Sequence, residues 1–262
     1  MAGLTPAEAY ALLEPGSRKG NTAIKLTLMW LLSRRVIEIR KSAVPGIFGK
    51  IRERDALFVR EPLPADCPPY LRRLLAIIDN PSGVRVDRIP LMCGYVYGSQ
   101  SHSFLREDVS RALIAKGFIT RTPRRALGIF PYEQYRRTKA GDQLASEINR
   151  TIVGLKSIPD MLERNPRQAA ALAFAAGGLI FLVPELVPHF TALAHAARRA
   201  DETGGDSGVS VPSSSAASSD DDPWQQVDLD TFEALETTFS SFSEGFDSGG
   251  GDGGDGGGGG GD

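Results

Sequence analysis

The sequence predicts a mainly helical α+β body followed by a long acidic tail, and three observations carry this prediction. Apolar residues recur at helical spacing through most of residues 1–200. Short segments that alternate apolar and charged residues interrupt the helical pattern, as expected of β-strands. All 30 Lys and Arg residues lie in residues 1–200, whereas 15 of the 32 Asp and Glu residues lie in residues 201–262. The body is therefore basic and the tail acidic.

The first predicted segment, residues 1–62, contains two helices and a pair of strands. Thr5 is suited to cap a helix, and Glu8 completes a capping box with it. The Pro45-Gly46 pair predicts a turn between two β-rich runs. The expected elements are helices over residues 5–13 and 21–33 and strands over 35–40 and 55–60.

The second predicted segment, residues 63–160, has the clearest pattern. Gly117 allows a sharp turn from a helix into a strand, and Thr138 caps the helix that follows a basic hairpin. Residues 94–98 fit a strand, a helix end or a loop. The expected elements are helices over 69–78, 104–116 and 138–155 and strands over 84–87, 118–121 and 132–137, with a basic tip over 122–127.

The order of helix, strand, basic hairpin and helix in the second segment resembles a winged-helix domain. The first segment follows a similar pattern, with Leu31–Ile37 in the place of Leu113–Ile119. The copies share a pattern rather than identical residues. We therefore expect two winged-helix-like segments in tandem.

An apolar stretch lies in the third predicted segment, residues 161–200. Ala169–Val183 holds 15 residues without a polar side chain, whereas a membrane-spanning helix needs about 20. The pattern predicts helices near 166–183 and 185–198, broken at Pro184. Two interpretations stay open, namely an apolar helical hairpin that packs on the body, and a segment that inserts into a membrane.

The tail, residues 201–262, is rich in Gly, Ser and Asp, and this composition is typical of disordered chains. One part of it differs, because five apolar residues fall on a single helical stripe among acidic neighbours. We interpret this part as a motif that folds when it binds a partner or the basic body itself, although such a short pattern also arises by chance. With the nearby tryptophan, the candidate residues are Trp224, Phe232, Leu235, Phe239, Phe242 and Phe246.

No catalytic, cofactor or metal site is predicted. The histidines His102, His189 and His195 lack the spacing and the carboxylate or thiol neighbours of metal ligands. Cys67 and Cys93 are too far apart for a metal knuckle and are expected to be thiols in a reducing compartment. Because no catalytic motif is found, we expect a protein that is not an enzyme. Because no secretory signal is evident, we expect it in the cytoplasm, with association to a membrane left open.

Several motifs together resemble a bacterial family of unknown function whose members end in a polyglycine tail and are often described as predicted membrane proteins. The matching features are Leu4–Tyr10, Tyr135–Gly141 and the Gly-rich end after Phe246. The resemblance implies tandem winged-helix segments and brings no catalytic residues. This sequence departs from the family in lacking clear spanning helices and cysteines in its tail.

These observations favour an interaction or scaffold protein with an unidentified protein partner. The first alternative is a DNA-binding regulator in which helix 104–116 enters the major groove and the hairpin contacts phosphates. The second alternative is a protein that associates with an anionic membrane through residues 166–198. The candidate nucleic-acid-binding residues are Arg106, Ser110 and Arg111 on the helix and Arg121, Arg124 and Arg125 on the hairpin.

Overall fold

The computed structural model describes residues 3–45, 51–63, 67–126 and 129–202 of the chain. This part is α+β and mostly helical, as the sequence predicts, with two small antiparallel sheets. The α-helices are α1 (Pro6–Leu13), α2 (Gly20–Ser33), α3 (Pro69–Ile78), α4 (Ile89–Tyr97), α5 (Ser110–Ala115), α6 (Lys139–Leu155), α7 (Ile158–Arg164), α8 (Pro166–Ala176) and α9 (Phe190–Glu202). The strands are β1 (Ile37–Pro45), β2 (Ile51–Val59), β3 (Val84–Arg85), β4 (Ile119–Ala126) and β5 (Phe130–Arg137).

Short helical turns of other types join these elements. The segment predicted as one helix over 104–116 is a π-helical stretch, η4 (Phe104–Val109), that continues into α5. Of the segment 94–98, left open by the sequence, residues 94–97 form the second half of α4 and Gly98 follows as its C-terminal cap. The remaining turns are the 3₁₀ segments η2 (Val86–Arg88), η3 (Ser99–Ser101), η5 (Gly177–Leu182) and η6 (Pro184–His189).

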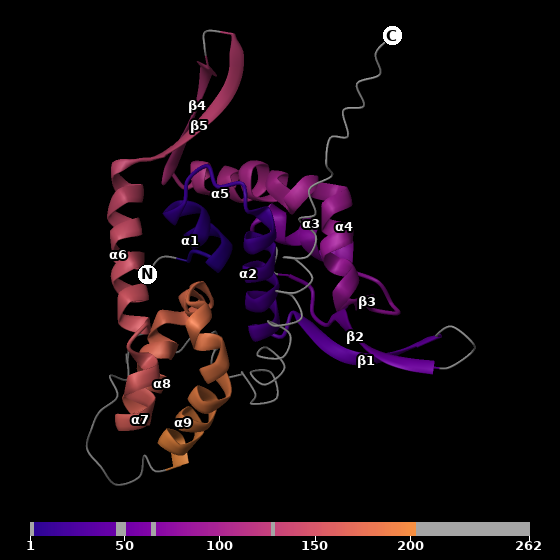
Figure 1. Ribbon diagram of the computed structural model, residues 1–262, viewed down its shortest axis with the longest axis vertical. Helices are drawn as coiled ribbons and strands as arrows, with labels where there is room; N and C mark the ends of the chain where they lie inside the picture. The colour runs from indigo at the N-terminus through magenta and orange to yellow at the C-terminus, as the bar shows by residue number, and fades with distance from the viewer. Residues whose placement is uncertain (1–2, 46–50, 64–66, 127–128, 203–262) are drawn as a thin grey trace, which may run out of the picture.

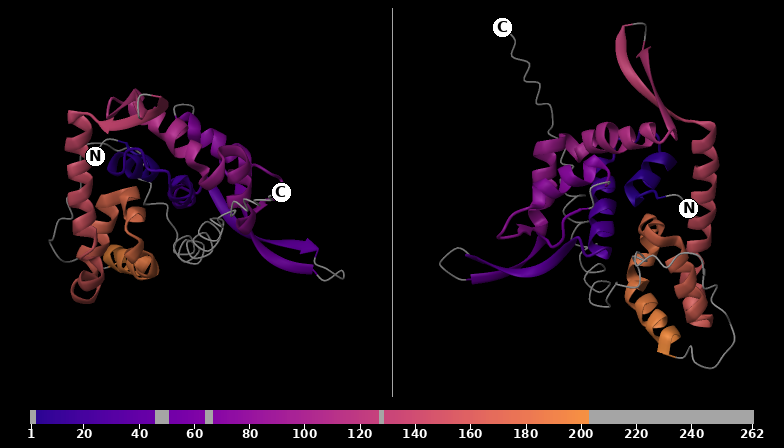
Figure 2. Two further views of the ribbon diagram at one scale, coloured as in Figure 1. Left: turned by 45° about the horizontal axis from the view of Figure 1, so that its top comes forward. Right: turned by 180° about the vertical axis from the view of Figure 1, so that it is seen from behind.

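Two β-hairpins project from the helical body in different directions (Figures 1 and 2). The first is β1–β2, which pairs antiparallel with Ile37 opposite Val59. The short strand β3 extends this sheet by pairing with β2, so that residues from both predicted winged-helix-like segments share one sheet. The second hairpin, β4–β5, forms a two-stranded sheet of its own, with Ile119 opposite Arg137.

The buried hydrophobic side chains form one cluster that extends from α1 to α9. Phe104 of η4 lies within it and meets two other aromatic rings edge-on. The centroid of its ring is 5.8 Å from that of Tyr70 in α3 and 5.1 Å from that of Tyr97 in α4. Such edge-to-face pairs each add about 1 kcal/mol to the energy of burial, so this contact fixes three helical elements against one another.

A buried polar cluster ties the start of α1 to the rest of the body. The predicted capping box is confirmed, because the Thr5 hydroxyl accepts from the Glu8 amide and the Glu8 carboxylate accepts from the Thr5 amide. The Glu8 side chain is fully buried, and the Lys116 ammonium lies 2.8 Å from both of its oxygens. Tyr70 lies 2.6 Å from the Thr5 hydroxyl, and burial raises the pKa of its phenol. The N-terminal helix is therefore held by residues from α3 and from the end of α5.

The C-terminal elements differ in detail from the predicted helices near 166–183 and 185–198. Helix α8 ends at Ala176 because Gly177 adopts a positive φ of 54°, and the chain then continues as 3₁₀ turns. A Cβ atom on Gly178 would lie 2.9 Å from Cγ of Pro6, so η5 meets α1 closely. Helix α9 begins only at Phe190 and lies beside α8 (Figure 1).

Apolar side chains of the stretch predicted either to pack or to insert into a membrane are buried in the core. The rings of Phe181 and Phe190 meet edge-on with their centroids 5.9 Å apart. In the described ranges, no helix is at once long and apolar enough to cross a bilayer. The buried residues of this region include Leu179, Ile180, Phe181, Val183, Leu186 and Phe190.

Candidate interaction surface

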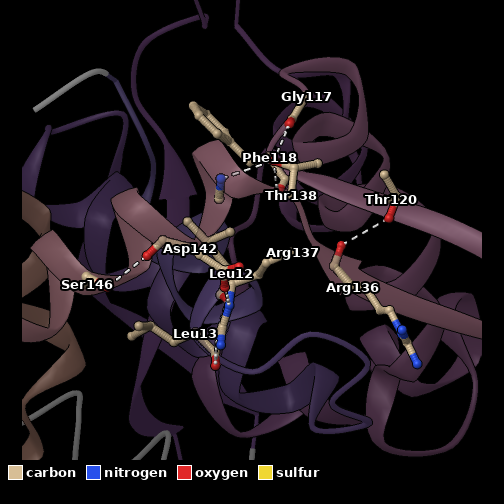
Figure 3. A network of polar contacts seen from close by, with 11 residues as sticks. Leu12, Leu13, Gly117, Phe118, Thr120, Arg136, Arg137, Thr138, Asp142 and Ser146 are labelled. Carbon is tan, nitrogen blue, oxygen red and sulfur yellow. Dashed lines mark hydrogen bonds and ion pairs between the residues drawn. The ribbon is translucent and has the colours of Figure 1, made fainter.

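The β4–β5 hairpin carries half of the predicted nucleic-acid-binding residues, and its base is anchored to the body by Arg137. The Arg137 guanidinium pairs with Asp142 of α6 at 2.8 Å. It also donates to the carbonyl oxygens of Leu12 and Leu13, at 3.2 and 3.1 Å (Figure 3). These carbonyls end α1, where a positive charge is favourable because they lack partners within the helix. One side chain therefore joins β5, α1 and α6.

The predicted junction between the hairpin and α6 is confirmed. The Thr138 hydroxyl accepts from the Gly141 amide, which caps α6, and donates to the Gly117 carbonyl oxygen at 2.8 Å (Figure 3). Gly117 has a positive φ of 74°, as the sharp turn from α5 toward β4 requires. A Cβ atom on Gly141 would lie 2.0 Å from the Phe118 carbonyl oxygen. The chain therefore has room only for glycine at this position.

On one face of the hairpin, the carboxylate of Glu133 neutralises nearby arginine charges. This carboxylate pairs with Arg121 of β4 and lies 4.0 Å from the Arg106 guanidinium of η4. The Tyr135 hydroxyl donates to Glu133 at 3.0 Å, and the Arg106 guanidinium lies 5.5 Å from the centroid of the Tyr135 ring. Two of the predicted contact residues, Arg106 and Arg121, are therefore engaged within the protein.

The opposite face of the hairpin carries arginines without a carboxylate. Because side chains alternate along a strand, residues opposite one another in the register share a face. The register pairs Thr120 with Arg136, Thr122 with Gln134 and Arg124 with Tyr132, away from the face of Tyr135. We call these six residues the arginine face. In the described residues it contains no acidic side chain, and both its arginines and Tyr132 are exposed: Thr120, Thr122, Arg124, Tyr132, Gln134 and Arg136.

The remaining predicted hairpin residue, Arg125, is exposed and lies on the same face as Arg121, near the tip. Over residues 119–137 the hairpin has five arginines and one glutamate. Such a projecting basic element creates a positive potential that attracts an anionic partner.

The helix predicted to read DNA bases presents little of the expected chemistry. Ser110 is buried, and its hydroxyl donates to the Leu105 carbonyl oxygen at 2.9 Å. Arg111 is exposed, but the acidic Glu107 is exposed one helical turn before it. The segment packs against α1, α2 and α3. Of the three candidate residues on this helix, only Arg111 is thus exposed.

Asp108 on the same helical segment is also committed to a contact within the body. It pairs with Arg73 of α3 at 2.6 Å, and its side chain is only 8% exposed. Burial raises the pKa of its carboxyl, although the nearby Arg73 acts in the opposite direction. The pair joins α3 to η4.

The structure thus brings Arg121, Arg124 and Arg125 together on one hairpin but separates them between its two faces. Arg136 and Tyr132 were not predicted as contact residues. The strand register identifies them, because each lies opposite a residue of the arginine face on β4. The predicted tail residues, Trp224, Phe232, Leu235, Phe239, Phe242 and Phe246, lie outside the described residues. No group of three or more potential metal ligands occurs within the described ranges.

Two comparisons with known proteins found no match to this chain. No family model matches the chain, and no curated protein matches it. The resemblance to polyglycine-tailed bacterial proteins therefore stays a prediction from the sequence.

Proposed function

We propose that this chain is a non-enzymatic, winged-helix-like interaction protein whose β4–β5 hairpin binds an acidic segment of a partner protein. The order of elements supports the winged-helix-like part of the proposal. Helix α3, strand β3, helix α4, the η4–α5 segment and the β4–β5 hairpin follow one another along the chain. In this proposal the hairpin corresponds to the wing.

The observation that carries the proposal is the arginine face. Its arginines lie on a hairpin that is held at its base by Arg137, Thr138 and Gly141. A firmly anchored element loses little conformational freedom on binding, which favours affinity. Arginine side chains beside an exposed tyrosine are also the residue types enriched in protein interfaces. We therefore expect the surface of the partner that contacts these arginines to carry carboxylates.

The side chains of the neighbouring η4–α5 segment favour a protein partner over DNA. A groove-reading helix needs exposed polar side chains that reach base edges. Here Ser110 is buried, Arg106 is engaged by Glu133 and Tyr135, and the exposed Glu107 would approach phosphates. The basic hairpin is left as the contact element.

Binding of a fluorescent polyglutamate peptide to the full-length protein tests the proposal. We expect the double variant Arg124→Ala/Arg136→Ala to bind about tenfold more weakly, because it removes the charge of the arginine face. The matched control is Arg40→Ala/Lys41→Ala, which removes two positive charges from the β1–β2 hairpin and is expected to change affinity less than about twofold. Equal weakening in both variants would show that only net charge matters and would overturn the proposal.

DNA binding is the second candidate, favoured by the exposed Arg124 and Arg125 on the hairpin. It predicts that the affinity for a 20-base-pair duplex falls steeply with salt, with a slope of about 0.9 per phosphate contacted. The variant Arg124→Ala/Arg125→Ala should flatten this slope by about two. If the duplex binds with no more salt dependence than polyglutamate, the hairpin is not a DNA-binding wing.

Membrane association through residues 166–198 is the weakest of the three candidates, because residues that would insert, such as Phe181 and Phe190, are buried in the core. In the proposed function the protein acts in the cytoplasm. The free thiols of Cys67 and Cys93 agree with a reducing compartment.

A further inference from the structure

Helix α4 has an apolar outer face that the described part of the chain does not cover. None of its nine residues is charged. Ile89, Cys93 and Tyr97 point into the core and are fully or almost fully buried. On the other side Leu91 is 47% exposed, Tyr95 81% and Val96 51%. A helix that is apolar all round is normally covered on all sides.

These exposed residues form a continuous surface. At 100° per residue, Leu91, Tyr95, the half-buried Met92 and Val96 span one side of the helix. Three of the six large hydrophobic residues that are exposed in the described chain lie on this one helix, and Figure 1 places it at an edge of the body. Such a concentration of exposed apolar area is typical of a docking surface. We call Leu91, Met92, Tyr95 and Val96 the α4 face.

The N-terminal end of the α4 face is positively charged. Arg85 donates to Asp87 with its Nε at 2.9 Å, and together with Arg88 and Arg54 it lowers the pKa of the Asp87 carboxyl. Three arginines therefore gather around one aspartate at the start of α4. The helix dipole adds further positive potential at this end. An occupant of the α4 face should accordingly be apolar where it meets the helix and acidic around that contact.

One segment of this chain has that chemistry. Residues 224–246 contain five acidic residues and no Lys or Arg. Their apolar residues are spaced so that a helix would carry them on a single stripe, at Phe232, Leu235, Phe239, Phe242 and Phe246. We propose that residues 224–246 dock on the α4 face of the same chain, with the aromatic stripe against Leu91, Tyr95 and Val96.

The connecting chain is long enough for this contact. Helix α9 ends at Glu202, and 21 residues precede Trp224. A Gly- and Ser-rich linker of this length has a root-mean-square span of about 25 Å and a fully extended length of about 70 Å. A compact body of this size has a radius of gyration of about 16 Å. The linker therefore reaches any side of the body.

The α4 face suits this segment better than the arginine face of the hairpin does. An amphipathic helix binds by placing its apolar stripe on an apolar surface. The arginine face offers charge, but only Tyr132 among its six residues is aromatic. The docking thus uses a surface separate from the proposed partner-binding hairpin, and each of the two proposals can fail without the other.

Photo-cross-linking in the full-length protein tests the docking. A photoreactive amino acid at position 95, which is largely exposed, should form an intramolecular cross-link to a peptide within residues 224–246, at a yield independent of protein concentration. The variant Phe239→Asp/Phe242→Asp should lower this yield at least about tenfold, because it places charge on the apolar stripe. The control variant Ser240→Asp/Ser241→Asp adds the same charge outside the stripe and should leave the yield within about twofold.

Three outcomes would overturn the docking proposal. The first is the absence of a cross-link from position 95 to residues 224–246. The second is a cross-linked dimer whose yield rises with concentration, since it would show that a second copy covers the α4 face. The third is a higher yield from a photoreactive group at position 132 than at position 95, since it would place the tail on the hairpin. The variant Arg124→Ala/Arg136→Ala should leave the cross-link from position 95 unchanged even if it abolishes polyglutamate binding.

Discussion

The two hairpins share an architecture but differ in how their charges are paired. The β1–β2 hairpin has four basic and three acidic residues on its strands, and Lys41 lies directly opposite Asp55 with a 2.8 Å ion pair. The β4–β5 hairpin has five arginines and only Glu133, which serves one of its two faces. A projecting hairpin is therefore not in itself a binding site. Within the part of the chain that the structure describes, the arginines on one face of β4–β5 have no carboxylate partner, and this distinguishes the two hairpins.

The hairpins also differ in how they join the body. The β1–β2 hairpin is continued sideways by β3. Among the described residues, the β4–β5 hairpin pairs with no third strand, and it is held at its base through Arg137, Thr138 and Gly141. The first arrangement stabilises a sheet, and the second orients an isolated arm.

The largest expected effect comes from breaking the anchor of the β4–β5 hairpin. Gly141→Ala should destabilise the protein by about 3 kcal/mol, because the new methyl group collides with the Phe118 carbonyl. Gly154→Ala in the same helix meets no atom within 4 Å and should instead raise the free energy of unfolding by up to about 1 kcal/mol. Urea denaturation measures both. Similar values for the two variants would contradict the close contact at the hairpin base.

The next prediction tests whether the protein interior around Cys93 of α4 excludes water. Burial raises the pKa of the Cys93 thiol to about 12 from a reference value of 9.0. Both states keep the thiol protonated below pH 8, but above pH 9 the unfolded state ionises first, so stability falls as the pH rises toward 12. At pH 10 we expect a loss of about 1.4 kcal/mol. Cys93→Ala should remove this part of the alkaline destabilisation, and an unchanged slope against pH would argue for a solvated thiol.

A smaller effect is expected when the β1–β2 hairpin is made to resemble the other one. Glu53→Gln/Asp55→Asn removes two carboxylates, including the partner of Lys41, without adding bulk. Because exposed charge governs the attraction of anions, the affinity for polyglutamate should rise by about threefold. No gain would mean that the anchored geometry of β4–β5, rather than its charge, decides binding.

The smallest effect is expected at the compensated face of the β4–β5 hairpin. Glu133→Gln frees Arg121 and Arg106 from their shared carboxylate and should strengthen polyglutamate binding by about twofold. Fluorescence anisotropy at two salt concentrations distinguishes this change from noise, since the gain should shrink as salt screens the charges. A weaker complex would show that Glu133 orients the arginines that bind.

Much of the local structure follows from short-range signals. The capping box of Thr5 and Glu8 starts α1, Gly117 ends the helix before β4, and Thr138 caps α6, as the sequence predicts. These features depend on residues within a few positions of one another, so they can be read without knowledge of the fold. The excess of arginines on the hairpin is equally a property of the sequence.

The tertiary structure decided which of the predicted contact residues are exposed and can bind a partner. Ser110 and Arg106 look suited to DNA in the sequence, but packing against α1–α3 buries the first and Glu133, 27 residues away, engages the second. The exposure of the apolar outer side of α4 also depends on neighbours distant in the chain. By itself the sequence determined the mainly helical α+β class, the local caps and turns, and the opposite charges of body and tail. Only the tertiary structure decided which arginines stay unpaired and which apolar helix face stays open, because burial and charge pairing arise between segments far apart in sequence.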